Sequence, residues 1–239
     1  NQQAFRAASG WPAELQEKAD AILKNLKSGR PVQYVLHESW FNDSLFYVDE
    51  SVLIPRPETE ELFDWIRKDH WNDPPPTRIL DIGTGSGILA VSLRRLYPET
   101  EVTAIDISEP AIRTAQKNAE RQGVSIQLQR MDFLATDEQS ALPSFDLIVS
   151  NPPYIAPVEK ESMAPHVLEH EPWQALFTPT HDPLCFYRAI AEFGSDHLSA
   201  AGSVYVEIHE DRAAETSEIL DRKSTRLNSS HEWISRMPS

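Results

Sequence analysis

The stretch LDIGTGSGILAVSL, residues 80 to 93, joins an apolar strand to a helix through a loop with glycine at every second position. Gly83, Gly85 and Gly87 let the backbone turn sharply and approach a ligand closely, and the start of the helix offers unpaired N–H groups. The G-x-G-x-G spacing lacks the further glycine of the G-x-G-x-x-G dinucleotide fingerprint. It favours a nucleoside that carries an amino acid over a pyrophosphate. For such a loop taken alone, a simple tight turn is the alternative.

The rest of this half of the chain alternates between short apolar strands and amphipathic helices. Such alternation is typical of βαβ units, so we expect an α/β fold: a mostly parallel sheet with helices on both faces. Ser108 and Pro110 are ordinary helix-starting signals. Strands are predicted at 78–82, 101–105, 125–129, 145–150 and 203–208, and helices at 86–96, 109–122 and 184–199.

The chain before residue 77 has a different pattern. Apolar residues at helical spacing predict a helix over 12–27, and residues 44–54 alternate like a β-hairpin. PRPETEELFDWIRK, residues 55–68, begins a helix after two prolines, with carboxylates in its first turn. The stiff segment NDPPPT, residues 72–77, is the best candidate for a domain boundary.

Composition limits the function classes. The 239 residues carry 22 Lys and Arg against 37 Asp and Glu, a net charge of -15, which disfavours a broad surface that grips a phosphate backbone. The single cysteine, Cys185, excludes an internal disulfide, and its apolar neighbours predict a core residue and not a nucleophile. No apolar run approaches the roughly 20 residues that cross a bilayer, and no secretory signal opens the chain.

Acidic residues follow the predicted strands at their carboxyl ends. Asp81 can accept a hydrogen bond from an ammonium group, and Asp106 can accept from both hydroxyls of a ribose. Asp132 can accept from an adenine amino group while Phe133 covers the base. Taken singly, Asp106 is also readable as an N-cap or a solvated strand end, and Asp132 with Phe133 as an ordinary loop. Together they lie where open α/β sheets bind ligands.

The stretch SNPPYIA, residues 150 to 156, follows the strand at 145–150 and places Asn151 at the same edge. A turn without chemistry is one interpretation, because prolines stop strands. The other is a backbone stiffened to hold polar atoms in place. With the glycine loop and the acidic residues, this motif makes the chain resemble the class I methyltransferases that use S-adenosylmethionine.

N-P-P-Y is associated with the members of that class that methylate a planar nitrogen, either an exocyclic amino group of a base or the side-chain amide of glutamine. The resemblance implies that the Asn151 side-chain oxygen and the Pro152 carbonyl accept the two N–H hydrogens of this nitrogen. Pro152 and Pro153 fix φ and lack N–H donors, so the acceptors are rigid and free. Tyr154 lies against the flat group and excludes water.

The upstream segment narrows the substrate. RPVQYVLHESWFNDSLFYVDESVLIPRPETEEL, residues 30 to 62, closely resembles the stretch before the methyltransferase domain in the glutamine N5-methyltransferases of bacterial peptide chain release factors. PVQY, Phe41, LFYV and above all LIPRPETE carry the likeness, with NPPYI and EPWQALF (171–177) downstream. It runs from about Pro12 to about Leu220. It implies that the target is the glutamine of a Gly-Gly-Gln loop on a release factor.

The resemblance also implies site residues. The catalytic set is Asn151, Pro152 and Tyr154, and the substrate-binding set adds Pro153. With S-adenosyl-L-methionine as cofactor, the resemblance implies that Gly83, Thr84, Gly85, Ser86, Gly87, Asp106, Phe133 and Asn151 bind it, and Asp81 and Asp132 join this set by their positions. Arg56, Glu58 and Thr59 are part of a lid beside the methyl donor and the substrate, or else an acidic helix start after a rigid bend. No metal is expected, and the lone histidines, including His37, His166 and His209, are read as structural or solvated.

Three features depart from the family pattern. His37 stands where the family usually has glycine, so the turn there differs or carries strain. The helical unit before Arg30 is shorter than the family's. Residues 221–239 do not resemble the family's closing β-hairpin, and we read them as non-native or disordered. Without those strands, 203–208 would be an unpaired edge.

We therefore divide the chain into a partial helical substrate-recognition domain (1–30), a hairpin and linker (31–76), a methyltransferase domain (77–220) and the atypical tail. The favoured function is methylation of a release-factor glutamine, by a cytoplasmic monomer that binds neither nucleic acid nor membrane directly. One alternative is an amino methyltransferase for DNA or ribosomal RNA, against which the net charge argues. Another is a truncated, inactive cofactor-binding module.

Overall fold

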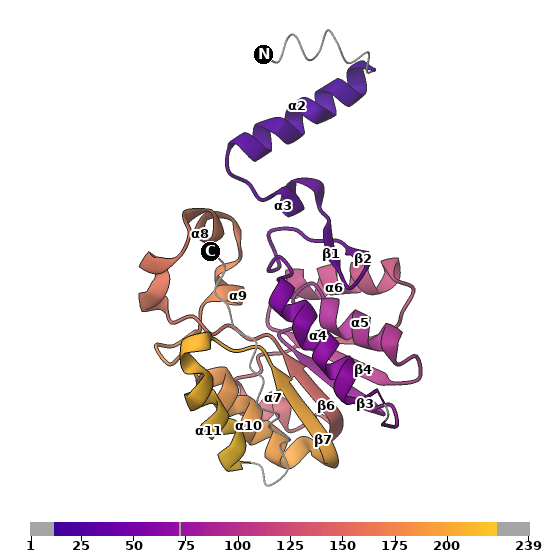
Figure 1. The fold of residues 1–239 in the computed structure, drawn as a ribbon, viewed down its shortest axis with the longest axis vertical. Helices are drawn as coiled ribbons and strands as arrows, with labels where there is room; N and C mark the ends of the chain where they lie inside the picture. Colours follow the sequence, from indigo (N-terminus) through magenta and orange to yellow (C-terminus); the bar gives the residue numbers. More distant parts are fainter. Residues whose placement is uncertain (1–11, 72, 224–239) are drawn as a thin grey trace.

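The centre of the molecule, in a computed structural model that describes residues 12–71 and 73–223, is a five-stranded parallel sheet (Figure 1). The strand order is β5-β4-β3-β6-β7, so the chain moves outward from β3 in one direction and then returns to its other side. This reversal places the carboxyl ends of β3 and β6 at a topological switch point, where such sheets bind ligands. The strands are β3 (Arg78–Ile82), β4 (Glu101–Asp106), β5 (Gln127–Arg130), β6 (Phe145–Ser150) and β7 (Leu198–Val206).

Helices cover both faces of the sheet, as the sequence predicts (Figure 1). One face carries α4 (Pro57–Asp69), α5 (Ile88–Leu96) and α6 (Glu109–Arg121), and the other α10 (Cys185–His197), with α11 (Ala213–Lys223) packed on α10. Ser108 caps α6, because its side chain accepts from the Ala111 N–H at 3.3 Å. Shorter elements are α7 (Thr136–Gln139), η1 (Pro157–Ser162), α8 (Pro165–His170), α9 (Trp173–Leu176) and η2 (Glu210–Arg212).

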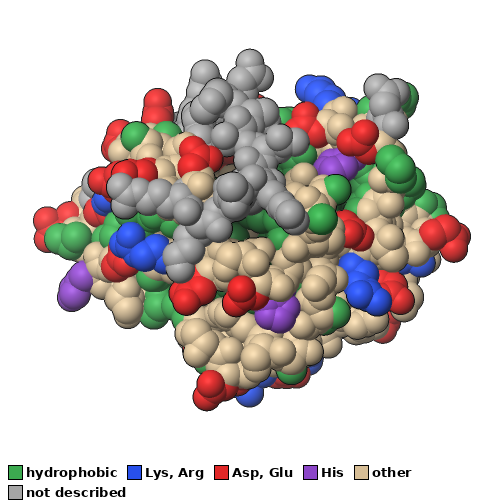
Figure 2. Space-filling model, turned by 90° about the horizontal axis from the view of Figure 1, so that it is seen from below, with side chains coloured by type: hydrophobic (Ala, Val, Ile, Leu, Met, Phe, Trp, Pro, Cys, Tyr) green, Lys and Arg blue, Asp and Glu red, His purple; other side chains and the backbone are tan. Residues whose placement is uncertain are grey.

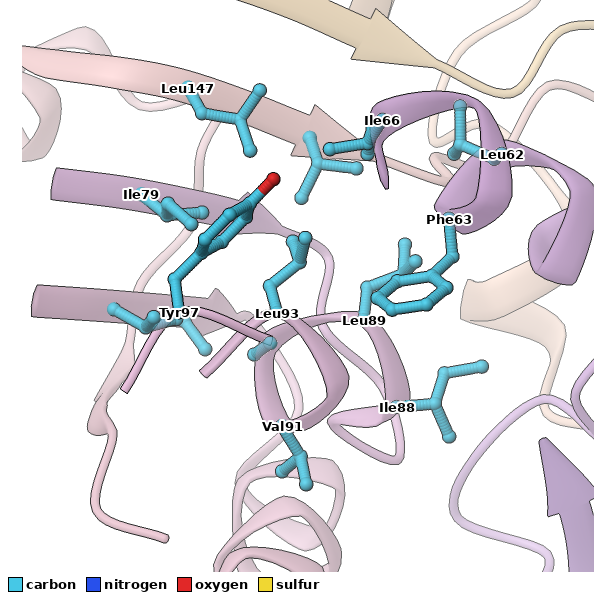
Figure 3. Close-up of a cluster of buried hydrophobic side chains, with 14 of the residues drawn as sticks. Leu62, Phe63, Ile66, Ile79, Ile88, Leu89, Val91, Leu93, Tyr97 and Leu147 are labelled. Carbon is cyan, nitrogen blue, oxygen red and sulfur yellow. The ribbon is translucent and has the colours of Figure 1, made fainter. Parts of the chain in front are cut away.

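Helix α4 shares its core with the sheet although it precedes the proline-rich segment. Phe63 and Ile66 of α4 pack in one cluster with Ile79 of β3, Leu93 of α5 and Leu147 of β6 (Figure 3). Burying a side chain of this size stabilises the fold by about 2 kcal/mol. This packing fixes α4 on one face of the sheet. The division of the chain into domains stays a prediction.

The hairpin lies earlier than predicted. It consists of β1 (Ser39–Phe41) and β2 (Ser44–Phe46), which pair antiparallel, and not of residues 44–54. Its turn residues Asn42 and Asp43 have φ of 45° and 56°. Both angles are positive, as in the two-residue turns that match the twist of paired strands, and Asn and Asp tolerate them better than most residues.

The first helices stand apart from the sheet. Helix α2 (Ala13–Lys27) confirms the helix predicted there, buries no residue and projects from the body of the molecule (Figure 1). The short α3 (Val32–Leu36) ends at His37, whose φ of 55° is left-handed. A glycine would adopt this conformation without strain, so the predicted strain is present. The His37 ring stacks on Tyr47.

Several element ends differ from prediction, most clearly the starts of α5, β5 and β7. Helix α10 ends at His197 and β7 at Val206, each two residues before the predicted end. Helix α5 begins at Ile88, because Ser86 and Gly87 belong to the loop. Strand β5 begins at Gln127, and β7 begins five residues early, at Leu198, where a register shift lets it pair with Phe145. Within the described residues β7 pairs only with β6, as an edge strand. Residues 221–223 are helical in α11, and the remainder of the atypical tail, 224–239, lies outside the described residues.

Candidate active site

A cavity of about 410 Å³ opens at the carboxyl edge of the sheet. Its walls are the glycine loop, the ends of β3 and β4, residues 51–56 and residues 172–179. A smaller cavity of about 70 Å³ adjoins it, with Pro152, Tyr154 and Glu207 in its wall. Asn151 lines both cavities, so this side chain stands where their contents would meet. Of the predicted cofactor-binding residues, only Gly87 is absent from the wall of the large cavity. The others line it: Asp81, Gly83, Thr84, Gly85, Ser86, Asp106, Asp132, Phe133 and Asn151.

The glycines of the loop serve two different purposes. Gly85 has φ of 54°, and a Cβ added there would meet no atom within 4 Å, so the loop leaves open space at this point in the cavity wall. Gly87 has φ of 78°, but a Cβ there would lie 2.9 Å from the Ala115 Cβ of α6. Gly87 therefore lets α5 pack closely on α6. The predicted contact between Gly87 and a cofactor stays a prediction.

Asp81 connects the glycine loop to the first turn of α5 through hydrogen bonds. Its Oδ2 accepts from the Thr84 hydroxyl at 2.6 Å and from the Ala90 N–H at 3.2 Å. Burial raises the pKa of this carboxyl to about 7. Asp81 also lines the cavity. Its predicted contact with a ligand ammonium group stays a prediction, and the structure adds a role in holding the loop.

Asp106 and Asn118 tie the loop to its neighbours. The two carboxylate oxygens of Asp106 accept from the N–H groups of Gly85 at 2.9 Å and Ser108 at 2.8 Å, and burial raises its pKa. Each oxygen has a second lone pair that a ribose hydroxyl could use. Asn118 of α6, which the sequence did not single out, donates to the Ser86 carbonyl at 2.8 Å.

Asp132 and Phe133 follow β5 in the wall of the cavity. The Oδ1 of Asp132 accepts from the Leu134 N–H at 3.0 Å. The ring of Phe133 is 4% exposed and packs edge to face on Phe193 of α10, with ring centroids 5.5 Å apart. Phe133 is thus mainly a core residue that contributes an edge to the cavity, and its predicted place over a base stays a prediction.

The N-P-P-Y motif continues β6 at the junction of the cavities. Asn151 donates from Nδ2 to the Thr59 Oγ1 of α4 at 3.1 Å. Pro153 lines the large cavity, and Pro152 and Tyr154 line the small one. The Tyr154 hydroxyl donates to Glu207 Oε1 at 3.4 Å. The motif is therefore held by side chains from two other parts of the chain.

Glu207 is the functional candidate that sequence reasoning missed. It follows β7, is 6% exposed, and accepts from the Thr59 hydroxyl on Oε2 at 2.8 Å. Burial raises its pKa to about 7. The available signal was a lone glutamate inside the apolar run VYVEI, since carboxylates are seldom buried without partners.

Arg56 lines both cavities and forms an ion pair with Glu171, which directly precedes the wall segment 172–179. Its guanidinium lies 2.6 Å from Glu171 Oε1, and the other carboxylate oxygen accepts from the Ile54 N–H at 3.4 Å. The Glu171 side chain is 2% exposed, so the ion pair is almost fully removed from water on that side. The segments LIPRPETE and EPWQALF are thereby connected. Whether the first acts as a lid stays a prediction.

Cys185 lines neither cavity. Cys185 is only half-buried at the start of α10, and not in the core as predicted, and burial raises the pKa of its thiol. Over residues 12–71 and 73–223, no cluster of three His, Cys, Asp or Glu side chains could hold a metal ion. None of the helices described is long and apolar enough to span a membrane.

The sequence is similar to that of known methyltransferases. Residues 67–177 match the family model described as "Methyltransferase small domain". The "Release factor glutamine methyltransferase" of Flavobacterium psychrophilum is 44% identical over 213 residues, which cover 87% of this chain and 74% of that protein. The protein of that name from Lactococcus lactis is 40% identical over 215 residues, with coverage of 89% and 77%.

Two solved structures share the fold. One is the 16S rRNA N2 G1207 methyltransferase of T. thermophilus in complex with AdoMet and guanosine, with a TM-score of 0.56, 16% identity and coverage of 79% of this chain and 45% of that one. The other is a methyltransferase from Pyrococcus furiosus, with a TM-score of 0.50, 17% identity and coverage of 86% of both chains. The fold is that of the class I methyltransferases.

Proposed function

The chain belongs to the release factor glutamine methyltransferase family, and from this premise we propose that it methylates the side-chain amide nitrogen of the glutamine in a release-factor Gly-Gly-Gln loop. The observation that carries the proposal is the state of Asn151. Its Nδ2 is already bonded to Thr59, so its remaining polar atom at the junction of the two cavities is an acceptor. An acceptor is what a substrate NH2 group requires.

The methyl donor is S-adenosylmethionine, and the residues of the large cavity fit it. Gly85 leaves open space beside the loop, and Asp81 and Asp106 supply carboxylates at two strand ends. The large cavity, at about 410 Å³, lies within the range of roughly 300 to 1,000 Å³ that is typical of small-molecule sites, so it can take a nucleoside with an amino acid attached. The small cavity, at about 70 Å³, cannot. When bound, the cofactor supplies an electrophilic methyl group on a sulfonium sulfur. We propose that Asp106 accepts from the ribose hydroxyls and that Asp132 accepts from the adenine amino group.

The residues of the N-P-P-Y motif orient the nitrogen that attacks. A carboxamide nitrogen is a poor nucleophile, because its lone pair is delocalised into the carbonyl. With its two hydrogens accepted by Asn151 Oδ1 and the Pro152 carbonyl, this lone pair is directed towards the large cavity. Pro152 and Pro153 offer no N–H that would compete for these acceptors. Tyr154 covers the amide from the small cavity and excludes water.

Transfer of radiolabelled methyl groups tests this function. The protein is incubated with labelled S-adenosylmethionine and a release factor, with a matched release factor whose Gly-Gly-Gln glutamine is alanine, and with DNA and ribosomal RNA. We expect label on the first substrate alone. Label on nucleic acid but not on the release factor would contradict the proposal and support the amino methyltransferase alternative. Absence of label from all of them, with cofactor binding intact, would support an inactive module.

We further propose that the protein acts as a cytoplasmic monomer without direct contact to nucleic acid. The net charge of -15 supports the last point. Over the described part of the face in Figure 2, the Lys and Arg side chains lie singly or in small groups among acidic ones and form no continuous patch.

A further inference from the structure

We propose that Glu207 and Thr59 fix the direction of the Asn151 side-chain amide, so that its oxygen and not its NH2 group faces the substrate. The inference rests on the proposed function and adds two positioning residues to it. The three side chains form one chain of hydrogen bonds: Asn151 Nδ2 donates to Thr59 Oγ1 at 3.1 Å, and Thr59 Oγ1 donates to Glu207 Oε2 at 2.8 Å. Nothing in the N-P-P-Y sequence itself determines which way the amide turns.

The direction of this chain follows from the number of hydrogens. A hydroxyl has one hydrogen, and an ionised carboxylate can only accept. The Thr59 hydrogen therefore goes to Glu207, and Thr59 Oγ1 is left as an acceptor for Asn151. An amide that faces this acceptor must present Nδ2, which turns Oδ1 away from Thr59. The carboxylate at one end thus decides which atom the amide presents at the other.

Burial protects the chain of hydrogen bonds between Asn151, Thr59 and Glu207 from competition by water. Thr59 is 2% exposed and Glu207 6% exposed, so water does not compete for the chain. The backbone of Glu207 is held at both sides, because its N–H donates to the Ser150 carbonyl and its carbonyl accepts from the Tyr187 hydroxyl, each at 3.0 Å. Titratable or charged groups near the carboxylate are Arg56 and Glu58 at the start of α4, Tyr154 beside the small cavity and Tyr187 on α10.

A reversed chain would impair catalysis without removing any residue of the motif. An amide in place of the carboxylate can present its NH2 group to Thr59, and the Thr59 hydrogen then points at Asn151, whose oxygen turns to receive it. The NH2 group of Asn151 would face the NH2 group of the substrate, and two donors cannot pair. The lone pair of the substrate nitrogen would lose its orientation. The turnover number should fall, while cofactor affinity should change little.

Isosteric variants test the chain. Glu207→Gln replaces the obligate acceptor, Thr59→Val removes the hydroxyl and Thr59→Ser keeps it. With saturating release factor and cofactor, we expect kcat to fall about 30-fold in the first two and less than about threefold in Thr59→Ser, with Kd for the cofactor within about threefold throughout. Glu192→Gln, the same charge change at an exposed position of α10, is the matched control and should keep the wild-type rate.

The double variant Glu207→Gln, Thr59→Val should be no slower than either single one, because each breaks the same chain. Wild-type kcat in Glu207→Gln would overturn the inference. So would a Thr59→Ser variant as slow as Thr59→Val, or losses that multiply in the double variant. A loss of cofactor affinity as large as the loss of rate would overturn it too, because it would indicate a collapsed cavity and not a turned amide.

A second measurement does not depend on activity. In ¹⁵N-labelled protein, the Asn151 side-chain NH2, assigned from the signal missing in Asn151→Ala, should give nuclear Overhauser contacts to the Thr59 γ-methyl, and these should weaken in Glu207→Gln. Their absence from the wild type, or their persistence unchanged in the variant, would overturn the inference. A wild type that shows them but transfers no label to release factor would contradict the proposed function alone.

Discussion

The two halves of the active site are held by different means. In the cofactor half the decisive contacts are local: Asp81 bonds to Thr84 three residues on, and Gly85 bonds to Asp106 across 21 residues. In the substrate half they span most of the chain, since Asn151 contacts Thr59 across 92 residues and Thr59 contacts Glu207 across 148. The glycine loop of the first half is therefore set by one βαβ unit, whereas the second half is set only by the complete sheet with α4 packed on it.

The largest effect should come from the substrate half. Asn151→Ala removes the acceptor for the substrate amide, and we expect kcat to fall about 1,000-fold, whereas cofactor affinity changes by less than about tenfold. Single-turnover rates and cofactor titration by calorimetry measure the two separately. Equal losses of rate and affinity would make Asn151 chiefly a cofactor residue and would remove the contrast between the halves.

An effect on stability should come from the cofactor half. Gly87→Ala places a methyl group 2.9 Å from the Ala115 Cβ at a left-handed position, and we expect it to lower the free energy of unfolding by about 3 kcal/mol. Gly123→Ala is the matched control. Its φ of 69° carries the same conformational penalty, but no atom lies within 4 Å of the added group, so we expect a loss of about 1 kcal/mol.

Urea denaturation of these two glycine variants measures the difference. Equal losses would mean that close packing of α5 on α6 contributes nothing beyond the backbone conformation, and that the third glycine of the loop is present for its φ alone.

The smallest effect is a pH dependence that separates the halves. Burial raises the pKa of Glu207 to about 7, and only the ionised carboxylate directs the hydrogen-bond chain. As pH falls through this pKa the group gains a proton, so kcat should fall about tenfold for each unit below pH 7 and level off above it. The measurement is kcat between about pH 5.5 and pH 8.5, at saturating cofactor and release factor.

The control for this profile is Glu207→Gln, which should be slow and flat across the range. Burial raises the pKa of Asp81 to about 7 as well, and saturating cofactor is used so that any change in cofactor affinity does not enter the rate. A profile in Glu207→Gln that still falls below pH 7 would assign the titration to another group, with Asp81 the first candidate.

The sequence predicts the cofactor half well, because the contacts that hold the glycine loop join residues close together in the sequence. Strand and helix patterns place the residues at 81, 83–87 and 106 at one sheet edge, and that is where they lie. The N-P-P-Y motif could be located in the same way. Its supports could not, because no periodicity or spacing connects Thr59 with Glu207; both come together only through the strand order.

The hairpin shows a second limit of sequence patterns. Residues 44–54 alternate, but the turn that makes the hairpin is Asn42-Asp43, which lacks the glycine that usually marks such turns. The buried partner of Phe46 is Phe41, on the other side of that turn. Alternation alone therefore identified one strand and assigned it to the wrong partner.

The ion pair between Arg56 and Glu171 has a consequence for how the sequence can change over generations. A substitution at either position alone leaves a largely buried charge without its partner, at a cost of about 3 kcal/mol or more. Exchanging both for apolar residues would cost far less. Substitutions at these two positions should therefore occur in pairs, so that two segments 115 residues apart in the sequence change together during evolution.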